Sequence, residues 1–209
     1  MAKARALRVL FIGNSFTARN HLPALVARMA EASGRKLNHR LISAGGASLR
    51  RHWNSGEALR EVRGGRYDQV VLQEQSTLPV KNAARMHESV RLFDAAIREA
   101  GAKTVLYMTW ARAHAPETQQ AITDAYLAIG RELGAAVIPA GMAWQRLLAE
   151  HDRPALHDRD GSHPTLAGSF LAACCAFAVL FDSSPVGIEV DVGLSAADAD
   201  LIQRAATPR

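Results

Sequence analysis

The sequence predicts an α/β fold, a three-layer α/β/α sandwich with a five-stranded parallel sheet. Short apolar runs alternate with longer segments of helical periodicity along the 209 residues. The runs are continuously apolar, which is typical of strands that are covered on both faces. Gly34, Gly101 and Gly134 follow helical segments and precede the next apolar run, as glycines that end helices do. Repeated alternation of strand and helix favours parallel strands.

The individual elements follow from these two patterns. The apolar runs predict strands at 7–12, 38–43, 69–74, 103–109 and 135–139. Helical periodicity predicts helices near 22–33, 55–63, 84–100, 116–133, 165–181 and 195–206. Because no linker, repeat or low-complexity tract interrupts this order, we expect one domain over 1–209.

Composition excludes several classes of protein. A hydrophobic fraction of 48% is enough for a sizeable core, and no apolar run reaches the length of a membrane span. The net charge is +5, but the arginines are scattered and no nucleic-acid motif accompanies them. The apolar run after the basic N-terminus lacks a signal cleavage site, so we expect a cytoplasmic protein. Cys174 and Cys175 adjoin each other in an apolar helix, which indicates buried packing residues.

Polar residues and glycines follow several predicted strands. In a parallel α/β sheet, the loops after the strands gather at one edge, where ligands bind. We therefore expect these candidate residues to lie near one another: Ser15, Gly46, Gln73, Gln75, Trp110, Arg112, Asp160 and His163.

The chemistry that this set favours is acyl transfer. A serine such as Ser15 becomes a nucleophile when a histidine such as His163 removes its proton, and Asp160 stands where it can orient that histidine. A glycine turn and a carboxamide supply donors to an oxyanion. Ser15 would lie at the N-terminus of a helix, so its backbone N–H would have no acceptor within the helix and could also bind the oxyanion.

Three blocks carry a resemblance to a known family. They are Gly13-Asn14-Ser15, Gly45-Gly46-Ala47-Ser48 and Asp160-Gly161-Ser162-His163. In this order the sequence resembles the SGNH hydrolase superfamily, the GDSL-like esterases and lipases. The resemblance implies the flavodoxin-like SGNH hydrolase fold and a Ser15–His163–Asp160 triad. It also implies an oxyanion glycine, for which the spacing to Ser48 favours Gly46.

The third block of the family differs here. Many members have Gly-x-Asn-Asp, whereas this chain has Gln73-Glu74-Gln75 after the third strand. Some carbohydrate-esterase branches use glutamine at this block, which makes Gln73 our first choice as oxyanion donor and Gln75 the second. An aromatic content of 6% and the lack of an apolar lid argue against long-chain lipids. By resemblance, we expect a short-chain, acetyl-type esterase for O-acetylated carbohydrates, with Trp110 and Arg112 in the substrate pocket.

Other interpretations remain open from the sequence. Ser15 and Asp160 are each good helix N-caps, and Asp158 is a second choice for the triad acid. A metal site at His157, Asp158, Asp160 and His163 lacks a helical ligand spacing, and we expect neither metal nor cofactor. We expect Asn14 to hold the turn that carries Ser15, and Asn20 and Trp53 to lie at most at the rim of the active site.

The sequence also leaves alternative functions open. They are a non-catalytic carbohydrate-binding or scaffolding domain and a nucleotide- or nucleic-acid-binding protein, although the glycine fingerprint of nucleotide-binding proteins is absent. The oligomeric state is not predicted.

Overall fold

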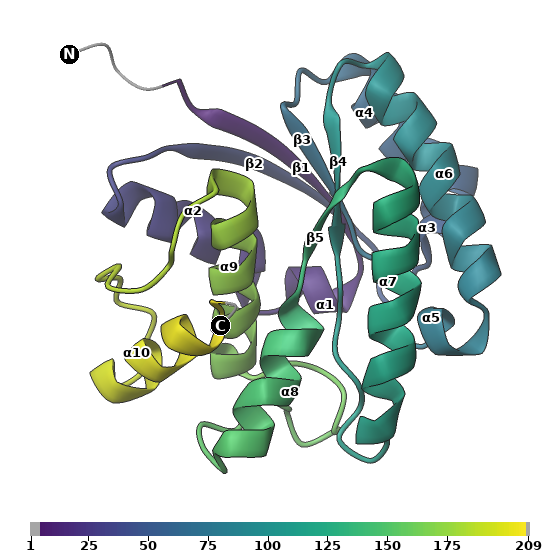
Figure 1. The fold of residues 1–209 in the computed structure, drawn as a ribbon. Coiled ribbons are helices and arrows are strands. Elements are labelled where there is room, and N and C mark those ends of the chain that lie inside the picture. The colour runs from purple at the N-terminus through teal and green to yellow at the C-terminus, as the bar shows by residue number, and fades with distance from the viewer. Residues whose placement is uncertain (1–4, 208–209) are drawn as a thin grey trace.

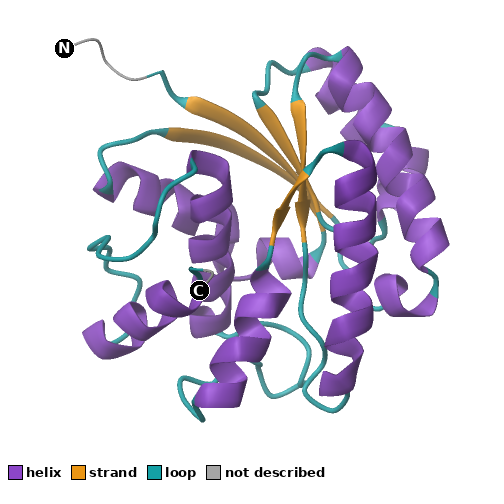
Figure 2. Cartoon of the chain, viewed as in Figure 1, coloured by secondary structure: helices purple, strands orange, loops and turns teal. Residues whose placement is uncertain are grey.

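The computed structural model describes residues 5–207 and confirms the predicted α/β architecture (Figures 1 and 2). Five strands pair in parallel in the order β2-β1-β3-β4-β5, which is the flavodoxin-like order. Each strand lies within about two residues of its predicted position at either end. The strands are β1 (Leu7–Gly13), β2 (Leu37–Ser43), β3 (Gln69–Leu72), β4 (Lys103–Tyr107) and β5 (Ala136–Ile138).

Helices cover both faces of the sheet. On the left in Figure 1 lie α2 (Leu22–Ala32), α8 (Ala140–Glu150), α9 (Leu166–Phe181) and α10 (Ala196–Ala205). On the right lie α3 (Leu49–Ser55), α4 (Glu57–Gly64), α6 (Ala83–Glu99) and α7 (Gln119–Leu133). Short elements stand between them: α1 (Ser15–Ala18), η1 (Arg19–His21), α5 (Leu78–Lys81) and η2 (Pro116–Thr118).

Strand β1 supplies side chains to both cores, because successive residues of a strand face opposite sides. Val9 and Phe11 pack against the α2 and α9 layer, whereas Leu10 and Ile12 pack against the α6 and α7 layer. All four side chains have no exposed surface. This burial on two faces explains why the run is continuously apolar. It also fixes the position of β1 between β2 and β3 in the sheet.

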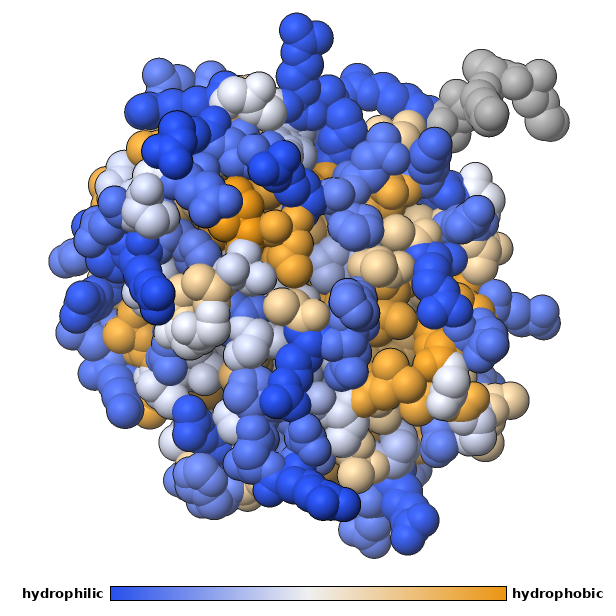
Figure 3. Space-filling view, turned by 180° about the vertical axis from the view of Figure 1, so that it is seen from behind, coloured by the Kyte–Doolittle hydropathy of each residue, from blue (hydrophilic) through white to orange (hydrophobic). Residues whose placement is uncertain are grey.

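Helix α9 is buried on almost every side, which its nearly uniform apolar sequence favours. Cys174 and Cys175 are fully buried there as free thiols, as predicted. None of the helices in residues 5–207 has the length and apolarity to cross a bilayer. In Figure 3, polar side chains cover most of the opposite face of the molecule, and apolar ones emerge in separate patches.

Two helical regions differ from expectation. The sequence analysis did not predict α8, which starts directly after β5 behind Pro139. The helix expected near 55–63 is α4, but the separate helix α3 before it was not predicted, and Gly56 with a φ of +73° lies between the two. Left-handed backbone of this kind is common for glycine and breaks an α-helix.

Candidate active site

The turn after β1 presents Ser15 at the start of a helix. Asn14 is the N-cap of α1, since its side chain accepts a hydrogen bond from the N–H of Phe16 at 3.1 Å. Its carboxamide also donates to the carbonyl of Ala47 at 2.9 Å, which holds the turn as predicted. The interpretation of Ser15 as the cap is therefore wrong. As the first helical residue, Ser15 keeps a backbone N–H that no described residue accepts.

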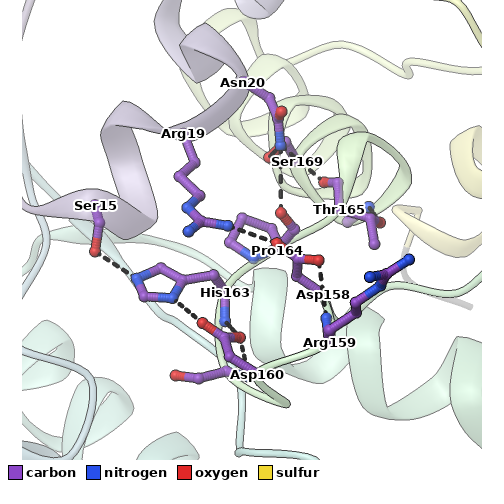
Figure 4. Close-up of polar contacts among 12 residues, drawn as sticks. Ser15, Arg19, Asn20, Asp158, Arg159, Asp160, His163, Pro164, Thr165 and Ser169 are labelled. Atoms are coloured by element: carbon purple, nitrogen blue, oxygen red, sulfur yellow. Dashed lines mark hydrogen bonds and ion pairs between the residues drawn. The ribbon is translucent and has the colours of Figure 1, made fainter.

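Ser15, His163 and Asp160 lie in one hydrogen-bonded row, drawn in Figure 4. The Oγ of Ser15 is 2.8 Å from Nε2 of His163, and Nδ1 of His163 is 2.5 Å from Oδ2 of Asp160. The His163 side chain, together with the backbone N–H groups of His163 and Ser162, holds the pKa of the Asp160 carboxyl well below its ordinary value. The carboxylate is thus ionised and fixes the orientation of the imidazole.

The alternative roles of the two aspartates are resolved by their contacts. Thr165 caps α9 by accepting from the N–H of Gly168 at 3.1 Å, so Asp160 is not the cap. The carboxylate of Asp158 pairs with Arg19 at 2.7 Å (Figure 4), and Asp158 meets His163 only through the backbone, where its N–H donates to the His163 carbonyl at 2.8 Å.

Asn20 ties the nucleophile segment to the loop that carries His163. Its amide nitrogen lies 3.0 Å from the carbonyl of Thr165 and 2.9 Å from Oγ of Ser169, with the carbonyl of Pro164 at 3.3 Å. Asn20 has a φ of +52° and His21 a φ of +53°, a left-handed backbone that asparagine tolerates better than most residues. Together with the Arg19–Asp158 ion pair, these bonds join two segments that are far apart in sequence.

Gly46 lies at the exposed tip of the turn after β2. Its φ is +62°, and a Cβ there would meet no atom within 4 Å, so the backbone angle rather than space favours glycine. No described residue accepts a hydrogen bond from its N–H. The bond from Asn14 to Ala47 places this turn beside Ser15.

Gln73 is not where an oxyanion donor should be, which corrects the first choice made from the sequence. Its side chain has no exposed surface, and its Oε1 accepts from the Asn14 N–H and the Thr17 hydroxyl, each at 2.9 Å. Its amide nitrogen donates to the carbonyl of Glu74. Gln73 thus stabilises the turn that carries Ser15 through these hydrogen bonds. A Cβ on Gly13 would come within 2.6 Å of Oε1 of Gln73, which explains the glycine before Asn14.

Gln75, the second choice, has a free amide nitrogen. Its Oε1 accepts from the Thr77 N–H at 2.9 Å and the Leu78 N–H at 3.0 Å, which fixes the side chain. Within residues 5–207, no group accepts a hydrogen bond from its Nε2. The side chain is half-buried.

Glu74 connects the second and third blocks, a role that the sequence did not indicate. Its Oε1 accepts from the N–H of Leu49 at 3.0 Å and of Gln75 at 2.6 Å. The side chain is fully buried, and Oε2 has no partner among the described residues. Burial raises the pKa of Glu74 to about 7, against the opposing effect of those two backbone bonds.

Trp110 and Arg112 follow β4, but they have different surroundings. Trp110 is 1% exposed and lies between two aromatic rings. Its ring stacks on that of Trp144 with 3.8 Å between the centroids, and the tilted ring of Phe16 has its centroid 5.1 Å away. Its indole N–H donates to the carbonyl of Ser162 at 3.1 Å, so it supports the His163 loop from inside. Arg112 is half-buried and lines two cavities.

The histidines and acids around the triad have other partners. His157 contacts the carbonyl of Ala111 through Nε2 at 2.9 Å, and burial lowers its pKa. Over residues 5–207, no three His, Cys, Asp or Glu side chains form a group suited to a metal ion.

Neither a protein-family model nor a curated protein matches the chain, but solved structures do. A protein from Slackia heliotrinireducens that is ascribed to the SGNH hydrolases shares 26% identity and superposes with a TM-score of 0.71, over 84% of this chain and 100% of that one. The chain has the SGNH hydrolase fold. This confirms the resemblance seen in the sequence.

Two further solved structures resemble this chain in fold. A DUF4886 family protein from Bacteroides uniformis, at 22% identity, has a TM-score of 0.78 over 97% of this chain and 93% of its own. An acetyl xylan esterase, at 16% identity, has a TM-score of 0.65 over 82% of this chain and 98% of its own. The likeness to the Slackia SGNH hydrolase supports a serine ester hydrolase, and the other two agree with it in fold.

Proposed function

We propose that the protein is an esterase for short acyl groups, with Ser15, His163 and Asp160 as its catalytic triad. The observation that carries the proposal is the row of contacts from Oγ of Ser15 to Nε2 of His163 at 2.8 Å and on to Asp160. Nucleophile, base and orienting acid stand within hydrogen-bond reach of each other, which is the geometry that acyl transfer needs.

The proposed reaction has two halves. Nε2 of His163 takes the hydroxyl proton of Ser15 as Oγ attacks the ester carbonyl, and Nδ1–H stays hydrogen-bonded to Asp160. The protonated imidazole then gives its proton to the leaving alcohol, and the acyl group remains on Oγ. In the second half, His163 takes a proton from water, the hydroxide attacks the acyl carbon, and the acid product leaves as Oγ is reprotonated.

The oxyanion of each tetrahedral intermediate needs donors that are fixed in advance. We assign this role to the backbone N–H groups of Ser15 and Gly46 and to the Nε2 of Gln75. All three are donors without an acceptor among residues 5–207. Gln75 replaces Gln73 in this proposal because the Gln73 amide is buried and engaged.

The proposed substrates are acetyl or similarly short esters, among them O-acetylated carbohydrates. A cavity of about 160 Å³, lined by the Trp110 that holds the carbonyl of Ser162, has room for a small group only. One structural neighbour is an acetyl xylan esterase, which is consistent with a carbohydrate ester but rests on fold alone.

The test is hydrolysis of p-nitrophenyl acetate and of acetylated sugars by wild type and by Ser15→Ala. We expect Ser15→Ala to lower kcat on the order of 10³-fold or more, because only binding and the oxyanion donors remain. The matched control is Ser43→Ala, an exposed serine at the end of β2, which should retain full activity. A fluorophosphonate probe should label wild type but not Ser15→Ala. Equal turnover by Ser15→Ala would reject the assignment, and absence of labelling with tight glycan binding would favour a carbohydrate-binding domain.

A further inference from the structure

A small cavity lies beside the proposed active site, between α5, the segment after β4 and the start of α7. Its volume is about 160 Å³, and its walls include Thr77, Val80, Lys81, Trp110 and Arg112. This is the space of about five water molecules, which fits a compact substituent and not a chain of sugar rings.

Trp110 connects the cavity to the catalytic residues. It forms part of the cavity wall and packs against Phe16, the residue that follows Ser15. Its indole N–H holds the carbonyl of Ser162, the residue before His163. On the other side, the cavity is lined by Ser76, which directly follows Gln75. The cavity is therefore connected through Trp110 to the residues next to Ser15 and His163, and through Ser76 to the residue next to Gln75.

The charge in this cavity is entirely positive. Lys81 and Arg112 are among its lining residues, and no aspartate or glutamate is. Neither cation forms an ion pair with any residue in 5–207, whereas arginines elsewhere do, as Arg91 does with Glu132 at 2.6 Å. The Nε of Arg112 is buried and has no acceptor among the described residues. A buried donor without a partner is destabilising, and an acceptor bound beside Arg112 would remove that penalty.

A second, larger cavity is also lined by Arg112, and its lining residue Ala113 donates its N–H to the carbonyl of Gly161, between Asp160 and His163, at 2.8 Å. Its volume is about 450 Å³, and Trp144, Leu148 and Ala149 make it mainly apolar. The stacked pair of Trp110 and Trp144 stands between this cavity and Phe16. Of these two cavities, the smaller one has a second unpaired cation, Lys81, beside Arg112, and Trp110 in its wall.

We propose that the natural substrate is an ester with a carboxylate, which Arg112 and Lys81 bind in the small cavity. The inference rests on the proposed esterase function and names the substrate class for the same site. A guanidinium holds a carboxylate through two parallel N–H bonds, and the ammonium of Lys81 adds a second positive charge. The carboxylate belongs either to the acyl half of the ester or to its alcohol half, and the experiment separates the two.

The experiment compares matched charged and neutral esters. For the alcohol half the pair is 4-acetoxybenzoate and 4-acetoxybenzamide, and for the acyl half it is 4-nitrophenyl hydrogen adipate and the corresponding adipic monoamide ester. Each kcat/KM is divided by the rate constant for hydroxide-catalysed hydrolysis, which removes differences in intrinsic reactivity. In at least one pair, we expect wild type to prefer the anion by about 10-fold or more, as charge-assisted hydrogen bonds typically give. Salt at 0.5 M should reduce the preference.

Arg112→Gln and Lys81→Gln should each lower this charged-to-neutral ratio, and the double variant should bring it near one. The control is Arg66→Gln, an exposed arginine before β3 at the opposite edge of the sheet, which should leave the ratio unchanged. Far-UV circular dichroism verifies that each variant is folded.

The outcomes separate the two proposals. Hydrolysis of neutral esters that depends on Ser15, with no preference for the anion in either pair, overturns the carboxylate inference and leaves the esterase function standing. If no ester is hydrolysed, the esterase function fails, and calorimetry of 4-acetoxybenzoate with the wild-type protein decides the site. Binding that is lost in Arg112→Gln then supports a carboxylate site, whereas no binding, or equal binding of 4-acetoxybenzamide, overturns it.

Discussion

The Oε1 of Gln73 lies where a Cβ on Gly13 would approach to 2.6 Å. The same oxygen accepts the N–H of Asn14 and the hydroxyl of Thr17, so it fixes the turn that carries Ser15. The glycine before the nucleophile motif is therefore needed for this close approach, and its φ is not left-handed.

Gly13→Ala should force Gln73 away from the nucleophile turn. We expect the free energy of unfolding to fall by about 1–3 kcal/mol, as overpacking of a tight core does, and kcat to fall because Ser15 loses its support. Urea unfolding and p-nitrophenyl acetate turnover measure the two effects. Gly64→Ala is the control, since a Cβ there meets nothing within 4 Å and the residue belongs to α4. It should change stability by less than about 1 kcal/mol, and in the stabilising direction.

The two aspartates near His163 should respond differently to neutralisation. Asp160→Asn removes the carboxylate that holds Nδ1 of His163, and the amide permits the wrong tautomer. We expect kcat to fall by about 10²–10⁴-fold at pH 8. Asp158→Asn only loses an exposed ion pair with Arg19 and should stay within about 3-fold of wild type. A larger loss in Asp158→Asn than in Asp160→Asn would reverse the assignment of the triad acid.

Because the pKa of Asp160 lies well below its ordinary value, this carboxyl stays ionised throughout mildly acidic conditions. Asp160 should therefore contribute no limb to the pH–rate profile of p-nitrophenyl acetate hydrolysis under mildly acidic conditions, in wild type and in Asp158→Asn alike.

Glu74 should make stability depend on pH. Its pKa is about 7 in the folded chain and near 4.5 when exposed, so between these values the folded state binds more protons than the unfolded state. Stability should consequently be highest below pH 4.5, as far as this group is concerned, and fall as the pH rises through 7. Glu74→Gln keeps the acceptor for Leu49 and Gln75 but cannot ionise.

Relative to wild type, Glu74→Gln should gain roughly 2–3 kcal/mol in unfolding free energy between pH 4.5 and pH 8. Urea titrations at several pH values give the difference directly. Glu31→Gln, on the exposed surface of α2, is the control and should show no such trend. A difference between Glu74→Gln and wild type that does not change with pH would contradict the buried carboxyl as its cause.

Asn20 should act as a positioning residue. Asn20→Ala loses the donor to Thr165 and Ser169 and puts alanine at a φ of +52°, so unfolding free energy should fall by about 2–3 kcal/mol. We expect kcat to fall more than KM rises, since the His163 loop loses its alignment with Ser15.

Asn20→Asp separates the backbone effect from the hydrogen bonds. Aspartate tolerates the left-handed backbone but cannot donate to carbonyl oxygens, so its kcat should fall as in Asn20→Ala. An exposed asparagine in β2, Asn38, provides the control, and Asn38→Ala should change stability by no more than about 0.5 kcal/mol. Wild-type kcat in Asn20→Asp would show that the hydrogen bonds do not position the loop.

The sequence was informative where the relevant contacts are local. The Asp160–His163 spacing and the serine after β1 are motifs of a few residues, and the strands are single apolar runs. Helix α8 also had a local signal that went unused, because Ala140, Ala143, Trp144 and Leu147 have the i, i+3, i+4, i+7 spacing.

The remaining features depend on contacts between distant segments. Gln73 and Gln75 lie two residues apart, and the sequence does not distinguish them. Only the hydrogen bonds from Asn14 and Thr17 to Gln73 show which carboxamide holds the nucleophile turn. The acceptors of Asn20 lie 145 and 149 residues further along the chain, so no neighbouring pattern indicates its contacts. The same holds for the burial of Glu74, which arises from the packing of three layers.

The 148 residues between Ser15 and His163 have a consequence during synthesis. Ser15 is synthesised 148 residues before the histidine that it contacts, and helix α9, which follows the histidine loop, is synthesised later still. With the proposed triad, we expect a nascent polypeptide to lack hydrolytic activity until the His163 loop and α9 have docked on the sheet. Ester hydrolysis by nascent chains of increasing length would then measure when the layer that contains α9 packs against the sheet.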